Sequence, residues 1–131
     1  MAVVHPDLHA FNMCAGGVID LEGAGWGPAG DDVATAPFVP ALCGLTSSAT
    51  PWFTPAQISE HLAMVDAVFS DRGLPSPTER LDELLVRRAL SLCVRGHPDP
   101  ALRRSRTRVL RAVVDTFLSG GAVSALLQQG G

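Results

Sequence analysis

Acidic and amide side chains gather near the start of the chain, in the stretch VVHPDLHAFNMCAGGVID that covers residues 3–20. Asn12 follows Asp7 after five residues, and Asp20 comes after an Ala15-Gly16-Gly17 segment. Glycines between two short apolar segments predict a β-hairpin, and a hairpin brings its two ends together. We therefore expect Asp20 to return close to Asn12, while Asp7 lies on the loop that leads into the hairpin.

The residue types in this stretch suit a particular chemistry. An amide oxygen and a carboxylate are ligands for a hard cation such as Mg²⁺, which takes few protein ligands and keeps other positions for water and substrate phosphates. Asp7 would then be a separate carboxylate that can accept a proton. One base, a magnesium pair and no nucleophile match phosphoryl transfer, where catalysis is mostly positioning and charge neutralisation. Taken singly, each of Asp7, Asn12 and Asp20 is better interpreted as a turn residue, since Asp and Asn favour turns.

Three segments together resemble the motifs of a known family. His5-Pro6-Asp7-Leu8-His9-Ala10-Phe11-Asn12 resembles the H-G-D-L-H-x-x-N catalytic loop of the aminoglycoside phosphotransferase and choline kinase-like family, relatives of the protein kinases. Val18-Ile19-Asp20-Leu21-Glu22 is similar to that family's I-D-[WF]-[ED] metal-binding segment. The stretch from Gly27-Pro28 to Asp32-Val33-Ala34 resembles its G-D-P-x-x-D-L-A segment. Three motifs in the right order within residues 3–35 make a specific signal.

The resemblance implies a chemical role for four residues. Asp7 would orient or deprotonate the hydroxyl of the phosphate acceptor. Asn12 and Asp20 would hold Mg²⁺ on ATP. His9 would contact the transferred phosphate.

Other matched residues would support the site. The resemblance implies that His5 packs under the loop and hydrogen-bonds backbone, that Asp32 caps a helix and ties the catalytic loop down through its N–H groups, and that Glu22 assists the metal. Two positions depart from the family pattern. Pro6 replaces a glycine and removes an N–H group, and Pro28 replaces an acid. Both departures weaken the case for activity more than the case for ancestry.

The elements that must position these residues fall into two regions. Residues 1–45 are expected to contain the catalytic loop, the hairpin, an irregular glycine-rich loop over residues 23–30 and a short helix from Asp31 or Asp32. Residues 54–128 are expected to form a helical subdomain. The two regions together predict a single partial domain over residues 1–131, mainly α with a small β-hairpin.

Three helices are expected over residues 54–73, 76–96 and 99–120. Each begins with Thr, Ser or Asp followed by proline, and each stops at a glycine. Thr54 and Gln57 form a capping box in the first helix. Apolar residues at helical spacing in the third helix are expected in the core, namely Leu102, Val109, Leu110, Val113, Val114 and Phe117.

The resemblance makes the chain the C-terminal lobe of a protein-kinase-like (α+β) fold, with the N-terminal lobe absent. Such folds use a strand lysine on the ATP phosphates, and these 131 residues include no lysine. We therefore expect the C-terminal catalytic portion of an ATP-dependent small-molecule kinase, inactive as an isolated chain. Its partners would be the missing lobe and a small-molecule hydroxyl substrate.

Charge and composition restrict the class of protein. The net charge is -3, and the arginines cluster on the predicted third helix without interleaved aromatic residues, so we expect a solvated helix face and no nucleic-acid partner. Acidic residues such as Glu60, Asp66, Asp82 and Glu83 could face a cationic substrate, but solvated helix faces explain them equally well. No signal peptide or apolar run long enough for a bilayer is present, which predicts a cytoplasmic protein without a membrane partner.

Two alternatives remain open. His5, Asp7 and His9 could be ligands of zinc or iron in a metal-dependent hydrolase, although no further His, Asp or Glu cluster with matching spacing follows. Alternatively, the chain is a non-catalytic kinase remnant or a helical interaction module, which would expose apolar surface where a missing lobe should dock.

Overall fold

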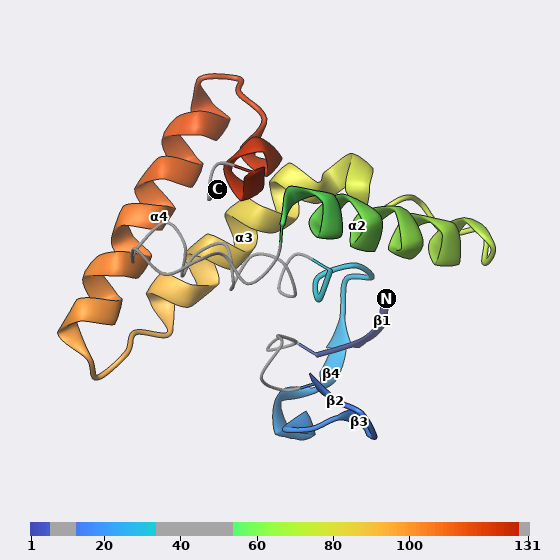
Figure 1. Cartoon of the computed structure of the whole chain (residues 1–131). Coiled ribbons are helices and arrows are strands. Elements are labelled where there is room, and N and C mark those ends of the chain that lie inside the picture. Colours follow the sequence, from blue (N-terminus) through green and yellow to red (C-terminus); the bar gives the residue numbers. More distant parts are fainter. Residues whose placement is uncertain (6–12, 34–53, 129–131) are drawn as a thin grey trace.

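The computed structural model describes residues 1–5, 13–33 and 54–128 (Figure 1). Helices dominate, and two small antiparallel sheets lie near the N-terminus. The prediction of a mainly α chain with a small hairpin is therefore confirmed. No helix in the described part is long and apolar enough to cross a membrane.

The predicted hairpin is confirmed. Strand β2 (Met13–Cys14) pairs with β3 (Gly17–Val18), with Met13 opposite Val18 and Cys14 opposite Gly17. Ala15 and Gly16 form the turn between them. Gly17 has a φ of 136°, a conformation that glycine adopts readily because it has no Cβ.

A second sheet was not predicted. Strand β1 (Ala2–Val4) pairs with β4 (Gly25–Gly27), which follows the short 3₁₀-helix η2 (Leu21–Gly23). The expectation of an irregular loop over residues 23–30 is wrong at β4, because the partner strand comes from a distant part of the chain. Gly27 also permits close packing, since a Cβ there would lie 2.5 Å from Val4 Cγ2.

The three helices are α2 (Pro55–Ser70), α3 (Leu81–Val94) and α4 (Pro100–Leu118). The predicted capping box of α2 is confirmed: Thr54 Oγ1 accepts from Gln57 N at 3.2 Å, and Gln57 Oε1 accepts from Thr54 N at 2.9 Å. The start of α4 is also confirmed, because Asp99 Oδ1 accepts from Ala101 N at 2.8 Å.

The predicted start of the middle helix is wrong. Thr78–Arg80 form a 3₁₀-helix, η3, and α3 begins at Leu81 without a side-chain cap. The Ser76 hydroxyl does not cap the helix. It donates to Asp66 Oδ1 of α2 at 2.6 Å, and Thr78 N donates to the same oxygen at 3.3 Å. The Asp66 carboxylate of α2, and not the Ser76 hydroxyl, therefore accepts the bond from the first backbone N–H of η3.

The apolar core of the described residues is helical. Helix α3 packs against α4, and both contact the C-terminal 3₁₀-helix η4 (Val123–Gln128). In α4, Val109 and Val113 are buried as expected, but Phe117 is 48 % exposed. The prediction that Phe117 lies in the core is wrong because burial of α4 ends one turn earlier. The buried cluster contains Ile58, Leu81, Leu84, Leu85, Ala89, Leu92, Val109, Val113, Val123 and Leu127.

Two contacts connect the turn at residues 30–31 to α3 and to the segment that precedes it. Arg87 Nη1 lies 3.2 Å from Asp31 Oδ1, and Arg87 Nη2 donates to the other carboxylate oxygen at 3.2 Å. Gly30 is buried, and a Cβ at this position would lie 3.1 Å from Pro77 Cβ and 3.7 Å from Leu84 Cδ1. The turn that carries Asp32 is thus docked onto the helices.

Candidate functional site

His5 directly follows β1 and is buried, with 7 % of its surface exposed. Its backbone N–H donates to Asp32 Oδ2 at 3.4 Å. Its ring Nε2 lies 3.4 Å from the carbonyl oxygen of Ile19. Because a carbonyl only accepts, this contact requires the proton on Nε2. His5 therefore contacts both the segment that follows the hairpin and the turn at Asp32.

Asp32 is half-buried in a turn that begins at Pro28. Asp31 N donates to Pro28 O at 3.2 Å, and Val33 N donates to Gly30 O at 3.0 Å. These bonds hold the Asp32 backbone while its carboxylate accepts from the backbone of His5. Asp32 was expected to accept hydrogen bonds from backbone N–H groups of the catalytic loop, and the bond from His5 N is of this kind. The helix that Asp32 was expected to cap falls outside the described residues.

Asp20 has an unusual backbone conformation. Its φ of 62° and ψ of 46° are left-handed, and it is the sole non-glycine residue with positive φ in the described part of the chain. A non-glycine residue in this region costs of order 1–3 kcal/mol and persists where its surroundings determine it. The hairpin precedes Asp20, η2 follows it, and His5 contacts the carbonyl of the preceding Ile19. Its side chain is exposed and makes no capping bond to η2.

The remaining predicted residues divide into two groups. Glu22 is described and exposed on η2, two residues after Asp20. Asp7, His9 and Asn12 lie outside the described residues. Their predicted roles stay predictions. The sheet register places Met13, the neighbour of Asn12 in sequence, opposite Val18.

Metal-binding capacity can be judged for the described side chains. Within residues 1–5, 13–33 and 54–128, no three His, Cys, Asp or Glu side chains come together in a metal-binding group. Asp20 offers an exposed carboxylate, which suits a Mg²⁺ that keeps most of its ligands as water and phosphate. The His5 nitrogen Nε2 faces a carbonyl instead. This contact argues against His5 as a zinc or iron ligand through that nitrogen.

Three of the four helical carboxylates that could have faced a cationic substrate make hydrogen bonds or ion pairs, whereas Glu60 is exposed on α2. Asp82 accepts from the backbone of η4, with Val123 N at 3.0 Å and Ser124 N at 2.8 Å. Glu83 pairs with Arg80 at 2.8 Å, and the hydrogen bond from Arg80 lowers the pKa of the Glu83 carboxyl. The Asp82 bonds join residues that are 41 and 42 positions apart, so no local sequence pattern predicts them.

Comparison with known proteins adds no assignment. No family model, curated protein or solved structure matches this chain.

Proposed function

We propose that this chain is the C-terminal catalytic portion of a cytoplasmic, ATP-dependent phosphotransferase of the aminoglycoside phosphotransferase type. Its acceptor would be the hydroxyl of a small molecule. The observation that carries the proposal is the arrangement of His5, Asp20 and Asp32. Three segments that resemble successive family motifs are joined by hydrogen bonds, and the proposed metal ligand has a left-handed backbone.

Each described residue has a defined task in this proposal. His5 donates from its ring to Ile19 O and from its backbone to Asp32, which fixes the spacing between the loop start and the metal-binding segment. The left-handed backbone of Asp20 orients a carboxylate that no η2 capping bond occupies. Asp20 and Asn12 would hold Mg²⁺, Asp7 would accept the hydroxyl proton, and His9 would contact the phosphate. Glu22 would assist the metal from η2.

The bound groups would supply charge neutralisation and the phosphoryl group. Mg²⁺ on ATP neutralises the charge that develops during phosphoryl transfer. A lysine-bearing N-terminal lobe is part of the proposal, because such a lysine contacts the ATP phosphates in kinase-like folds. Metal binding is therefore the sharper test on this chain, and turnover is the test once that lobe is supplied.

The test is a titration of the ¹⁵N-labelled chain with Mn²⁺, a paramagnetic substitute for Mg²⁺, in the presence of ATP. We expect NMR signal broadening centred on residues 18–22. Asp20→Asn should weaken Mn²⁺ binding by at least about tenfold, since even outer-shell changes at metal sites cost 10–100-fold. Asparagine tolerates a left-handed backbone, so this variant should keep the fold.

The matched control is Asp115→Asn, which removes one exposed carboxylate from α4. It should leave Mn²⁺ binding unchanged. Absence of broadening at residues 18–22, or equal weakening in both variants, would contradict the proposal. With the N-terminal lobe supplied, Asp7→Ala should abolish phosphate transfer and keep Mn²⁺ binding, and retained turnover would rule out its role as the base.

A further inference from the structure

Helix α4 has an unusually uneven charge distribution. It contains five arginines and a single acidic residue, Asp115, although the whole chain carries a net charge of -3. Arg106 is half-buried and has a structural task, because its Nη1 donates to Leu92 O at 3.1 Å and to Gly96 O at 2.8 Å at the end of α3. The other four arginines of α4 are exposed, namely Arg103, Arg104, Arg108 and Arg111.

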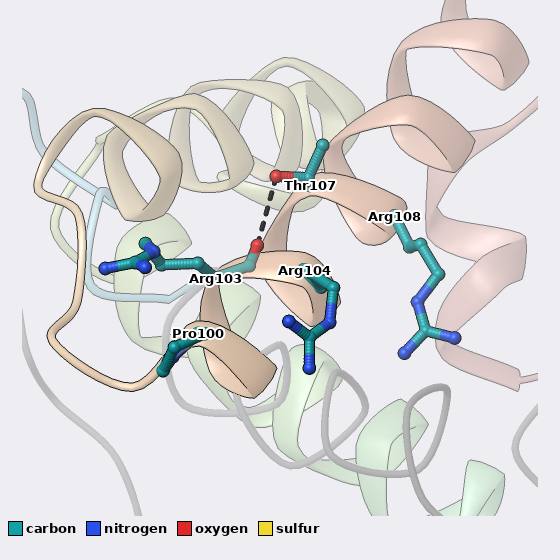
Figure 2. A pocket seen from close by; sticks show the side chains of 5 residues that line it. All are labelled: Pro100, Arg103, Arg104, Thr107 and Arg108. Atoms are coloured by element: carbon teal, nitrogen blue, oxygen red, sulfur yellow. Dashed lines mark hydrogen bonds between the residues drawn. The ribbon is translucent and has the colours of Figure 1, made fainter.

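The N-terminal half of α4 lines an open cavity of about 680 Å³ (Figure 2). Arg104 and Arg108 are one helical turn apart, and their side chains extend to the same side. Arg103 extends the other way, and its Nη1 donates to His97 O at 2.8 Å. Thr107 donates its hydroxyl to Arg103 O at 3.0 Å. The cavity therefore presents two guanidinium groups in one direction.

Arg104 and Arg108 have no acidic partner among the described residues. The ion pairs in this part of the chain involve Arg80 and Arg87 instead. Like charges at positions i and i+4 destabilise a helix. The arrangement is thus electrostatically unfavourable on its own. A bound anion would relieve this repulsion.

We propose that this cavity binds a small polyanion that carries two or more phosphate groups. Guanidinium groups bind phosphate oxygens through paired N–H donors. A volume of about 680 Å³ lies within the range of small-molecule pockets, roughly 300–1,000 Å³. The described lining residues include no aromatic side chain on which a nucleic-acid base could stack. The described lining residues all belong to α4, and the proposal does not rest on the proposed phosphotransferase function.

The test is isothermal titration calorimetry of the full chain with inorganic tripolyphosphate, pyrophosphate and phosphate at low ionic strength. Tripolyphosphate should bind most tightly, because it can contact both guanidinium groups. Arg104→Gln and Arg108→Gln should each weaken binding by about tenfold, as expected for the loss of a charge-assisted hydrogen bond. Both side chains are exposed, so circular dichroism should show an unchanged helix content.

Two controls separate a cavity from general positive charge. Arg95→Gln removes an exposed arginine at the end of α3 and should leave binding unchanged. Arg111→Gln removes an exposed arginine of α4 that does not line the cavity, and it should have a small effect. Absence of tripolyphosphate binding, or an equal loss in Arg95→Gln, would overturn the proposal. Tighter binding of a single-stranded DNA oligonucleotide, with Arg111→Gln as harmful as Arg104→Gln, would replace it with an extended nucleic-acid face.

Discussion

The N-terminal region over residues 1–33 and the helical region over residues 54–128 differ in where apolar side chains lie. Every member of the buried apolar cluster belongs to the helical region. In the described N-terminal region, Val4, Val33 and His5 are buried, while Val3 and Trp26 face solvent side by side across the β1–β4 pair. Among the described residues, His5, Asp20 and Asp32 thus lie in the region with less apolar burial. Its geometry depends on hydrogen bonds, one tight turn and docking to α3.

The largest expected effect comes from removing core volume in the helical region. Leu85 is fully buried in α3, so Leu85→Ala should lower the free energy of unfolding by about 2–5 kcal/mol. Urea unfolding followed by circular dichroism measures the change. Leu90→Ala makes the same substitution in the same helix at a position 45 % exposed, and it should cost only about 0.5 kcal/mol. Equal losses would show that the core is not where the buried cluster lies.

A smaller effect should follow from loosening the docking contact. Gly30 has a φ of 95°, and an added Cβ would meet Pro77, so Gly30→Ala should cost about 1–3 kcal/mol. Hydrogen exchange should accelerate at Val3 and Val4 more than at amides of α3. Gly73→Ala is the control, since Gly73 also has positive φ but has open space around it. Its effect should stay at the end of α2. Equal acceleration in β1 and α3 after Gly30→Ala would mean that the two regions open as one unit.

The smallest effect concerns pH and the helical region. Burial lowers the pKa of His61 from its ordinary value of 6.5, and its Nε2 is buried without a hydrogen-bond partner in the described residues. The unfolded chain therefore takes up this proton first as the pH falls. The His61 contribution to stability is complete above pH 6.5 and declines as the pH falls from there toward the lowered value in the folded chain.

Urea unfolding at about pH 7.5 and about pH 5.5, either side of the ordinary histidine pKa, measures this effect. The native chain should lose more stability than His61→Gln over that interval. Comparison of the two removes the contribution of carboxylates, which both chains share. Parallel losses would show that His61 is protonated equally in the folded and unfolded states.

The elements that could be predicted from sequence are those with local signals. The Thr54–Gln57 box, the Asp99 cap and the glycine turn of the hairpin each involve residues that are close in sequence. The β1–β4 pair and the late start of α3 depend on distant partners. The Ser76 hydroxyl donates to Asp66, which belongs to α2, and no propensity of Ser76 itself indicates this bond.

The candidate site shows the same division. The resemblance to phosphotransferase motifs indicated His5, Asp20 and Asp32, but a motif gives no geometry. The left-handed backbone of Asp20 and the contact of the His5 ring with Ile19 O came from the structure. The cavity beside Arg104 and Arg108 was not predicted. The sequence shows only a cluster of arginines, and a solvent-exposed helix face was a sufficient explanation for that cluster.

The short β1–β4 pair has a consequence for how ligand binding would be observed. Regions with little apolar burial open locally at lower free energy than a helical core. A ligand that binds only the closed form stabilises that form by RT ln(1 + [L]/Kd). Occupancy near Asp20 should therefore protect the amides of β1 and β4 first. A ligand on the helices should instead protect the amides of α3 and α4 most, so one exchange experiment would report which region a ligand occupies.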